Sequence, residues 1–344
     1  MKSEWRIAKL SSLVEMGNGR KRPLLDGDYP VYGGNGVMGY AGQFNSCNCI
    51  VVGRVGAYCG NVHRCVDKCW VSDNAINITV KDSYSFDFVY YLMQSVDFHH
   101  HRIGGAQPLM TQEIIGRQQV AIPSLSTQCK IAAVLSSLDD KIETNHAICR
   151  NLEEQADAFY KQYFVSGEKS SWNEGKLSDF IEVKYGKDHK KLADGTIPVY
   201  GSGGLMRYAE RALYESESVL IPRKGTLNNV MLVMEPFWTV DTMFYSVMKV
   251  KNAAKFVFLF LKGKDLASMN AGSAVPSMTT EILNSMELRL PPKAVLDDFE
   301  HNVAPIYQTI ATKKCENERL ASLRDTLLPR LMSGELDVRD VHLR

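Results

Sequence analysis

The segment YPVYGGNG occupies residues 29–36, and the closely similar IPVYGSGG occupies residues 197–204. Residue 29 of the first segment corresponds to residue 197 of the second, a spacing of 168 residues. The same spacing relates further identical pairs, which are Met38 and Met206, Tyr40 and Tyr208, Trp70 and Trp238, and Asp73 and Asp241. A spacing kept over so many positions indicates an internal duplication, with two copies of one structural unit.

The duplication extends to both ends of the copies. AQPLMTQEI at residues 106–114 corresponds to AVPSMTTEI at residues 274–282, at the same spacing. The openings, WRIAKLSSLVE at 5–15 and WNEGKLSDFIE at 172–182, correspond after a slip of one residue. We therefore expect two similar folded units that have diverged in sequence.

The composition is that of an ordinary globular protein, with 344 residues of which 45% are hydrophobic and 23% charged. This length accommodates two or three domains. The longest apolar run, FVFLFL at 256–261, is too short to span a membrane, and the N-terminus lacks the apolar core of a signal peptide. We expect a cytoplasmic protein with no membrane partner. Its net charge of +1 means that any DNA binding must come from local clusters of charge or from partner subunits.

Eight cysteines raise the question of a metal site, because five of them lie between Cys47 and Cys69. Their spacing does not repeat a CxxC pair, and the second copy has no cysteine at the matching positions. The three histidines of HHHR at 99–102 are consecutive, so they cannot easily converge on one ion. We predict no metal site, reduced buried thiols, and a solvated or phosphate-facing patch at HHHR.

Each copy begins with a globular part, at residues 1–123 and 171–291, in which strand and helix patterns are mixed. Short runs rich in β-branched residues predict strands at 49–58, 75–80, 218–223 and 230–234. We expect helices at 86–95 and 255–264, and one or two helical turns at 111–116 and 280–285. Each part is interpreted as a mixed α/β domain, so the fold class of the chain is α+β.

Each copy ends in a long helix, predicted at 124–170 and 292–344. Its apolar residues alternate in steps of four and three, which is the heptad seam of a coiled coil. The seam residues expected to pack the helices are Ile131, Leu135, Leu138, Ile142, Leu152, Phe159, Val303, Ile306, Ile310, Leu320 and Leu327. Polar residues at the centre, Asn145, Lys313 and Asn317, would fix the register. We predict an antiparallel coiled coil; the alternative is that each helix packs only on its own globular domain.

Catalytic signatures are missing from the sequence: it contains no GxxxxGK[ST], no HExxH and no GxSxG. Basic residues instead cluster beside the glycine-rich segment of both copies, in GNGRKRP at 17–23 and GKDHKK at 186–191. Arg54, in VGRVG, corresponds to Arg223, in IPRKG. An arginine that follows a strand and is flanked by glycine suits contact with DNA phosphates or base edges.

Taken in order, these segments resemble the specificity (S) subunits of type I restriction–modification systems. The resemblance rests on YPVYGGNG and IPVYGSGG, on the domain ends GAQPLMTQEIIGRQQVAIP and GSAVPSMTTEILNSMELRLPP, and on the helical segments QCKIAAVLSSLDDKI and LLPRLMSGEL. It covers essentially the whole chain. One departure is that Gln107, usual in the family motif, is Val275 in the second copy, which argues against one universal base-reading role at that position.

The resemblance implies a non-catalytic reader of double-stranded DNA with two target-recognition domains, at 1–123 and 171–291, separated by spacer helices. It also implies two methyltransferase (M) subunits, which bind S-adenosylmethionine and methylate adenine N6, and restriction (R) subunits, which use ATP and Mg. No cofactor is expected in this chain. The candidate DNA-binding residues are Arg20, Lys21, Arg22, Tyr32, Asn35, Arg54, Arg102, Gln107, Lys187, Lys190, Lys191, Tyr200, Ser202, Arg223, Lys224 and Thr226.

Helices of about 40 residues would be on the order of 60 Å long, which lies between one and two turns of B-DNA. The expected target is therefore two short half-sites whose centres lie about one turn or somewhat more apart. Two other classes of protein stay open. One is a stand-alone metal-dependent enzyme with a site between the repeats, and the other is a two-headed adaptor that binds protein. Tightly bound metal would favour the enzyme, whereas salt-sensitive binding to duplex DNA would exclude the adaptor.

Overall fold

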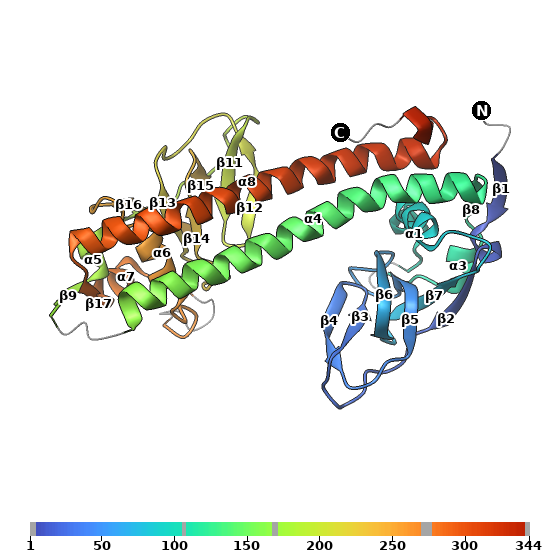
Figure 1. Cartoon of the computed structure of the whole chain (residues 1–344), viewed down its shortest axis with the longest axis horizontal. Coiled ribbons are helices and arrows are strands. Elements are labelled where there is room, and N and C mark those ends of the chain that lie inside the picture. Colours follow the sequence, from blue (N-terminus) through green and yellow to red (C-terminus); the bar gives the residue numbers. More distant parts are fainter. Residues whose placement is uncertain (1–4, 105–107, 167–170, 270–276, 341–344) are drawn as a thin grey trace. The chain divides into compact units, whose positions relative to one another are not determined.

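The computed structural model describes residues 5–104, 108–166, 171–269 and 277–340 (Figure 1). The chain divides into two compact units: the first contains residues 1–145 and 314–344, and the second contains residues 146–313. Each unit combines one globular domain with a part of both long helices. The expected domain boundaries treat each long helix as a separate segment, whereas this division cuts both helices.

The first globular domain is built on a six-stranded sheet in the order β2-β7-β5-β6-β3-β4, in which only β3 and β6 pair in parallel. Its strands are β2 Val14–Asn18, β3 Tyr29–Gly33, β4 Gly36–Ala41, β5 Ser46–Gly53, β6 Val62–Val71 and β7 Ala75–Val80. A separate pair joins β1 Arg6–Lys9 to β8 Gln119–Ile122. The helices are α1 Phe86–Ser95, α2 Phe98–His101 and α3 Gln112–Gly116, with a 3-10 turn at Leu10–Ser12.

The second globular domain divides the same strands between smaller sheets. A four-stranded sheet has the order β10-β16-β13-β14, and a three-stranded sheet has the order β12-β11-β15. The strands are β9 Asn173–Lys176, β10 Ile181–Tyr185, β11 Ile197–Gly201, β12 Gly204–Ala209, β13 Ser218–Pro222, β14 Met231–Val233, β15 Trp238–Thr239, β16 Met243–Met248 and β17 Glu287–Leu290, which pairs with β9. The helices are α5 Leu177–Phe180, α6 Ala254–Lys262 and α7 Thr280–Ser285.

The duplicated glycine-rich segment forms the same hairpin in both domains. It is β3–β4 in the first domain and β11–β12 in the second, and the register shifts at equivalent places, between Val31 and Tyr32 and between Val199 and Tyr200. The first strand of each hairpin also pairs in parallel with the tryptophan strand, so Val31 lies opposite Trp70 and Val199 opposite Trp238. The structure thus confirms the duplication that the sequence indicates.

The predicted strand at 49–58 ends five residues early, at Gly53. A side chain at this position would place its Cβ only 2.2 Å from the carbonyl oxygen of Tyr58 and 2.9 Å from the Cα of Gly34. The chain therefore needs glycine here and turns away into a loop, in which Gly56 has a φ of +77°. The expected helix at 86–95 is confirmed as α1, which Ser85 caps by accepting from the amide of Phe88.

The long helices are α4, Leu125–Tyr160, which continues as a π-helical turn at Lys161–Val165, and α8, Lys293–Met332, followed by a 3-10 turn at Val338–Asp340. Ser124 caps α4 by accepting from the amide of Thr127 at 3.3 Å. The predicted end of the first long helix, residues 167–170, lies outside the described residues. No helix in the described part of the chain is long and apolar enough to span a bilayer.

The two helices are paired by their heptad seams inside each unit. In the first unit, the beginning of α4 shares a buried core with the end of α8, through Ile131, Leu135, Leu138, Leu327 and Leu331. In the second unit, the end of α4 meets the beginning of α8, through Cys149, Ala156, Phe299, Val303, Ile306 and Ile310. Ile142, Leu152, Phe159 and Leu320 are partly buried. Each unit thus contains an antiparallel pair, as predicted.

The central asparagines of the seam contact each other. Asn145 Nδ2 donates to Asn317 Oδ1 at 2.8 Å, and Asn317 Nδ2 donates to the carbonyl of Ile142 at 3.2 Å. Both residues are buried. Because this pairing is possible in only one alignment of the helices, it fixes their register in the first unit. The helices also pack on the globular domains, since Phe88 of α1 belongs to the same core cluster as Ile131.

Each domain is also attached to a long helix by a cation between two carboxylates. In the first unit, Arg64 of β6 lies 2.8 Å from Asp87 of α1 and 3.9 Å from Asp140 of α4. In the second unit, Lys255 of α6 lies 2.7 Å from both Glu217 and Glu300 of α8. Position 255 corresponds to position 87 by the repeat spacing. The same arrangement is therefore made with the charge reversed at that position.

Candidate nucleic-acid interface

The turn between β6 and β7, at residues 72–74, holds the first basic segment in place. The indole nitrogen of Trp70 donates to the carbonyl of Arg20 at 3.0 Å, and the amide of Arg20 donates to the carbonyl of Val71 at 2.9 Å. The side chains of Arg20, Lys21 and Arg22 are exposed. The backbone of the basic segment is thus fixed while its charges face solvent.

Arg54 lies on the other side of the same turn. Its amide donates to the carbonyl of Asn74 at 2.8 Å, and its own carbonyl accepts from the amide of Met110 at 2.8 Å. Its guanidinium reaches the carbonyl of Asp73 at 3.5 Å. The segment at Met110, near the end of the domain, and the turn after β6 therefore meet at this arginine, whose side chain is half-buried.

The hairpin turn at 33–36 is the third part of one group, which we call the Arg54 constellation; the other two parts are the basic segment at Arg20 and the loop at Arg54. Gly34 lies against Gly53 and Tyr58, and its carbonyl is 3.0 Å from Nε2 of His63. Asn35, at the tip of the turn, is exposed. The hairpin tip, the Arg54 loop and the basic segment are consequently neighbours, although they are far apart in the sequence.

The second domain repeats these contacts with different residues. The indole nitrogen of Trp238 donates to the carbonyl of Lys187 at 2.9 Å, just as Trp70 donates to Arg20. The amide of Arg223 donates to Thr242 at 2.8 Å, its guanidinium to the carbonyl of Asp241 at 3.3 Å, and its carbonyl accepts from Met278 at 2.9 Å. Arg54 and Arg223 are thus structurally equivalent, as are Arg20 and Lys187.

The second constellation differs from the first in what surrounds its arginine. The guanidinium of Arg223 lies over the ring of Tyr185, with 5.3 Å between Cζ and the ring centroid. The hairpin turn is held by Asn229, whose Nδ2 donates to the carbonyl of Ser202 at 2.8 Å. The exposed candidates beside it are Lys190, Lys191, Lys224 and Thr226.

Several candidates lie away from these constellations or have other contacts. Tyr32 packs against a buried cluster of Cys49, Cys65 and Cys69, and burial raises the pKa of its phenol far above the ordinary value. Tyr200 packs on the core of its own domain. Arg102 is exposed at the end of α2. Gln107 lies outside the described residues.

The sequence did not single out four residues that complete the constellations: Tyr58, His63, Tyr185 and Asn229. Tyr58 and Tyr185 are exposed at 49% and 53% although they are large aromatic residues. The corresponding positions of the other copy hold no aromatic residue, so the repeat could not reveal these two tyrosines. His63 is within a strand, and nothing in its spacing indicates a contact with the hairpin turn.

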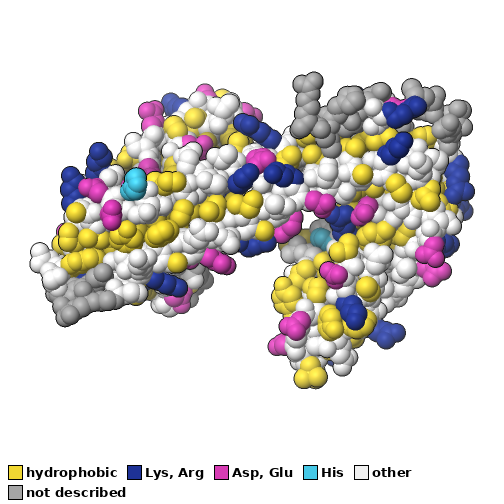
Figure 2. Space-filling model, in the orientation of Figure 1, with side chains coloured by type: hydrophobic (Ala, Val, Ile, Leu, Met, Phe, Trp, Pro, Cys, Tyr) yellow, Lys and Arg dark blue, Asp and Glu magenta, His cyan; other side chains and the backbone are white. Residues whose placement is uncertain are grey.

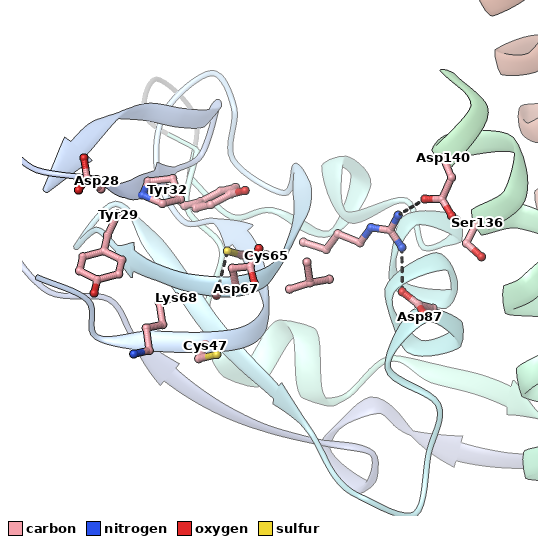
Figure 3. A pocket seen from close by; sticks show the side chains of 13 residues that line it. Asp28, Tyr29, Tyr32, Cys47, Cys65, Asp67, Lys68, Asp87, Ser136 and Asp140 are labelled. Carbon is pink, nitrogen blue, oxygen red and sulfur yellow. Dashed lines mark hydrogen bonds and ion pairs between the residues drawn. The ribbon is translucent and has the colours of Figure 1, made fainter. Parts of the chain in front are cut away.

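A cleft of about 890 Å³ in the first unit does not suit DNA (Figure 3). Its lining includes four carboxylates, Asp28, Asp67, Asp87 and Asp140, against the cations of Arg64 and Lys68. Arg64 is already occupied by Asp87 and Asp140. A phosphate would be repelled here. On the face drawn in Figure 2, Lys and Arg are scattered among acidic residues, in keeping with the net charge.

Cys49, Cys65 and Cys69 lie in one buried cluster, and the residues that the structure describes contain no group of three or more His, Cys, Asp or Glu that could hold a metal ion. Cys49 and Cys69 are buried with their sulfurs 3.6 Å apart. The Cys69 thiol lowers the pKa of Cys49 to about 7, whereas the same contact and burial raise the pKa of Cys69. Cys47 is exposed.

Comparison with known proteins identifies the class. The family model of the type I restriction modification DNA specificity domain matches residues 2–154 and again residues 169–310. The chain belongs to this family, and the resemblance drawn from its duplicated segments is confirmed. This membership favours a DNA-recognition subunit over the stand-alone enzyme and the protein adaptor.

Curated relatives and a solved structure agree with this assignment. The specificity subunit of the type I restriction enzyme MjaIX from Methanocaldococcus jannaschii is 23% identical over 312 residues, covering 77% of this chain and 72% of that protein. The specificity subunit of HindI from Haemophilus influenzae is 22% identical over 332 residues, covering 67% and 72%. The crystal structure of a type I S subunit from M. genitalium shares the fold, with a TM-score of 0.68, 20% identity, and coverage of 95% and 96%.

Proposed function

We propose that this chain reads a bipartite DNA target, with one half-site for each globular domain. The observation that carries the proposal is the repeated constellation around Arg54 and Arg223, which three matched hydrogen bonds hold at equivalent positions. A single reader would need only one such site. Two equivalent sites on one chain suit two separate stretches of duplex.

The chemistry of each constellation suits nucleic acid. Each guanidinium donates to the carbonyl of an aspartate, Asp73 or Asp241, which restrains it, and guanidinium binds phosphates and the acceptor edge of guanine. The neighbouring basic segments, which begin at Arg20 and Lys187, add positive charge that can contact the DNA backbone. The family membership supports the same conclusion.

The proposal assigns catalysis to partners. Two M subunits would bind S-adenosylmethionine and methylate adenine N6, and R subunits would cleave DNA with ATP and Mg. No cofactor is assigned to this chain, and the complex would act in the cytoplasm. Purified chain alone should transfer no methyl group to DNA, whereas chain mixed with its M subunits should. Methyl transfer by the chain alone would contradict this division of labour.

The decisive experiment compares Arg54→Ala with Arg223→Ala in the complex with M subunits. Bound sequences are selected from random duplexes, and affinity is measured at several salt concentrations. If an arginine contacts phosphate, its loss weakens all sequences and lowers the salt slope by about one charge. If it reads a base, its loss costs about 1–3 kcal/mol at one position of one half-site.

Matched controls are Arg117→Ala in the first domain and Arg211→Ala in the second, because both arginines are exposed and lie outside the constellations. Neither control should change the selected sequence. The proposal fails if the wild-type complex selects one continuous site. It fails as well if both constellation variants keep wild-type affinity, salt slope and sequence preference.

A further inference from the structure

We propose that Arg22 and Arg207 are equivalent base-reading residues, one for each half-site, although they come from different positions of the two copies. This inference rests on the proposed function and deepens it. Neither residue could be paired with the other by the repeat spacing, since the position that matches Arg207 is Gly39. Their equivalence exists only in three dimensions.

In the first domain, Arg22 reaches across to the edge strand β4. Its Nη2 donates to the carbonyl of Tyr40 at 2.9 Å and to Asp26 Oδ1 at 3.0 Å. Gly39 leaves the space that the guanidinium occupies, because a Cβ there would lie 3.0 Å from Nη1 of Arg22. The φ of Gly39, +148°, is also one that favours glycine.

In the second domain, the guanidinium is supplied by the edge strand β12 itself. Arg207 replaces Gly39 and reaches back, so that its Nη2 donates to the carbonyls of Leu192 at 2.6 Å and Ala193 at 3.3 Å. The same nitrogen lies 3.6 Å from Asp194, which is the repeat partner of Asp26. Both copies thus place one arginine against an equivalent aspartate and at an equivalent edge strand, β4 or β12.

The edge strands beside the two guanidinium groups carry exposed side chains at matching positions. Met38 and Tyr40, at 47% and 55%, flank Gly39 in β4, and Met206 and Tyr208, at 54% and 41%, flank Arg207 in β12. Val37 and Leu205, at 48% and 45%, extend each apolar strip. Apolar side chains beside an arginine are a combination that reads base edges, because thymine methyl groups and guanine acceptors lie side by side in the major groove.

The arrangement orients each arginine and leaves some of its hydrogen-bond donors unused. The side chains of Arg22 and Arg207 stay 42% and 30% exposed. In each arginine, Nη2 contacts the carbonyl and carboxylate partners described above, and Nε of Arg207 also donates to the carbonyl of Tyr208. Within the described residues, Nη1 of each arginine has no hydrogen-bond acceptor. An exposed ion pair adds little stability on its own. Its effect here is to restrict the orientation of the guanidinium, as base recognition requires.

The spacing fits a short half-site. The turn of the hairpin contacts the Arg54 loop through Gly34, and Gly36 to Gly39 spans three strand residues, about 10 Å. That distance corresponds to roughly three base pairs at 3.4 Å each. Arg22 and Arg54 can therefore reach the same half-site at different positions.

The test uses the complex of the full chain with its M subunits and a library of random duplexes. Arg22→Ala should remove the preference for one base pair, a guanine pair, in the first domain's half-site and leave the second half-site intact. Arg207→Ala should do the reverse. The ratio of the affinities for matched and mismatched duplexes should fall by roughly 5- to 150-fold at that position only.

Lysine variants separate base reading from simple charge. Arg22→Lys and Arg207→Lys keep the charge but lose the planar fork, so they should relax the same positions as the alanine variants. Asp26→Asn and Asp194→Asn keep the arginine but weaken its orientation, and they should relax the same positions by less. Arg117→Ala, which removes an exposed charge outside the constellations, should leave the selected sequence unchanged.

Two results would overturn the inference while leaving the proposed function standing. One is that the wild-type complex selects a split target and that every Arg22 and Arg207 variant selects the same target. The other is a uniform loss of affinity with a lower salt slope that lysine restores, since this would identify phosphate contacts. If the wild-type complex selects no split target, the proposed function fails, and this inference fails with it.

Discussion

Replacing Lys255 by methionine should destabilise the second unit more than any other single lysine change on α6. The side chain of Lys255 is 4% exposed, and its ammonium lies 2.7 Å from Glu217 and Glu300, which are 29% and 19% exposed. Methionine has a similar length and fills the same space. The variant therefore removes the charge and little packing, and it leaves two carboxylates facing each other.

The expected loss follows from this burial. Removing one partner of a buried ion pair costs about 3–5 kcal/mol. Because both glutamates keep some contact with solvent, we expect the lower end, about 3 kcal/mol. For a unit of this size that corresponds to a melting temperature lower by roughly 6–12 °C. Glu300 is the more sensitive partner, since its Oε2 is buried with no hydrogen bond in the described structure.

The assay is amide hydrogen exchange of the full chain, resolved by peptide, because it reports each unit separately. Peptides of α6 should lose protection in Lys255→Met, while those of α1 should not. Lys262→Met is the matched control: it lies on the same helix, is 37% exposed, and is 3.6 Å from Glu153, so it should cost less than about 1 kcal/mol. Adding Glu217→Gln and Glu300→Gln to Lys255→Met should restore most of the loss. If Lys255→Met costs no more than Lys262→Met, the charges do not hold the domain on α8.

Two further predictions concern the helix seam and the thiol cluster. Asn145→Ala or Asn317→Ala should each cost about 1–3 kcal/mol in urea unfolding, because the remaining asparagine loses its buried partner, whereas the double replacement by leucine should recover this loss. Equal losses in the single and double variants would contradict the pairing. Cys49 should titrate near pH 7, giving a thiolate absorbance step at 240 nm that Cys49→Ser removes and Cys47→Ser retains. The lowered folded pKa of Cys49 contributes stability that is present above about pH 9 and is lost as the pH falls through 7, whereas the raised folded pKa of Cys69 takes stability away as the pH rises above 9.

Local patterns in the sequence were enough to predict the helices α1 and α6, the two long helices and four strands, and they missed others such as β6, Val62–Val71. The heptad seam gave both long helices and their antiparallel pairing, because burial of an apolar stripe depends on spacing alone. The residues of α1, Phe86–Ser95, were predicted in full, since Ser85 is a strong cap and the helix is apolar. The early end of β5 at Gly53 was missed, because the close approach of Gly34 comes from a distant part of the chain.

The candidate site was only partly predictable for the same reason. Arg54 and Arg223 could be paired because both follow equivalent strands. Tyr32 was expected to face DNA, and its role stays a prediction, but its ring packs on thiols that a sequence reading could not place beside it. Arg207 was not found at all, because the repeat spacing aligns it with a glycine.

The cation between two carboxylates limits which parts of the two copies can be exchanged. Position 87 is acidic and faces Arg64, whereas position 255 is basic and faces Glu217 and Glu300. Grafting α6 in place of α1 would set Lys255 beside Arg64, and the reverse graft would bring three acids together. Like charges in such contact cost several kcal/mol. The two copies have therefore drifted as sets of compensating residues, and a recombinant chain should tolerate the transfer of a whole domain while rejecting that of a single helix.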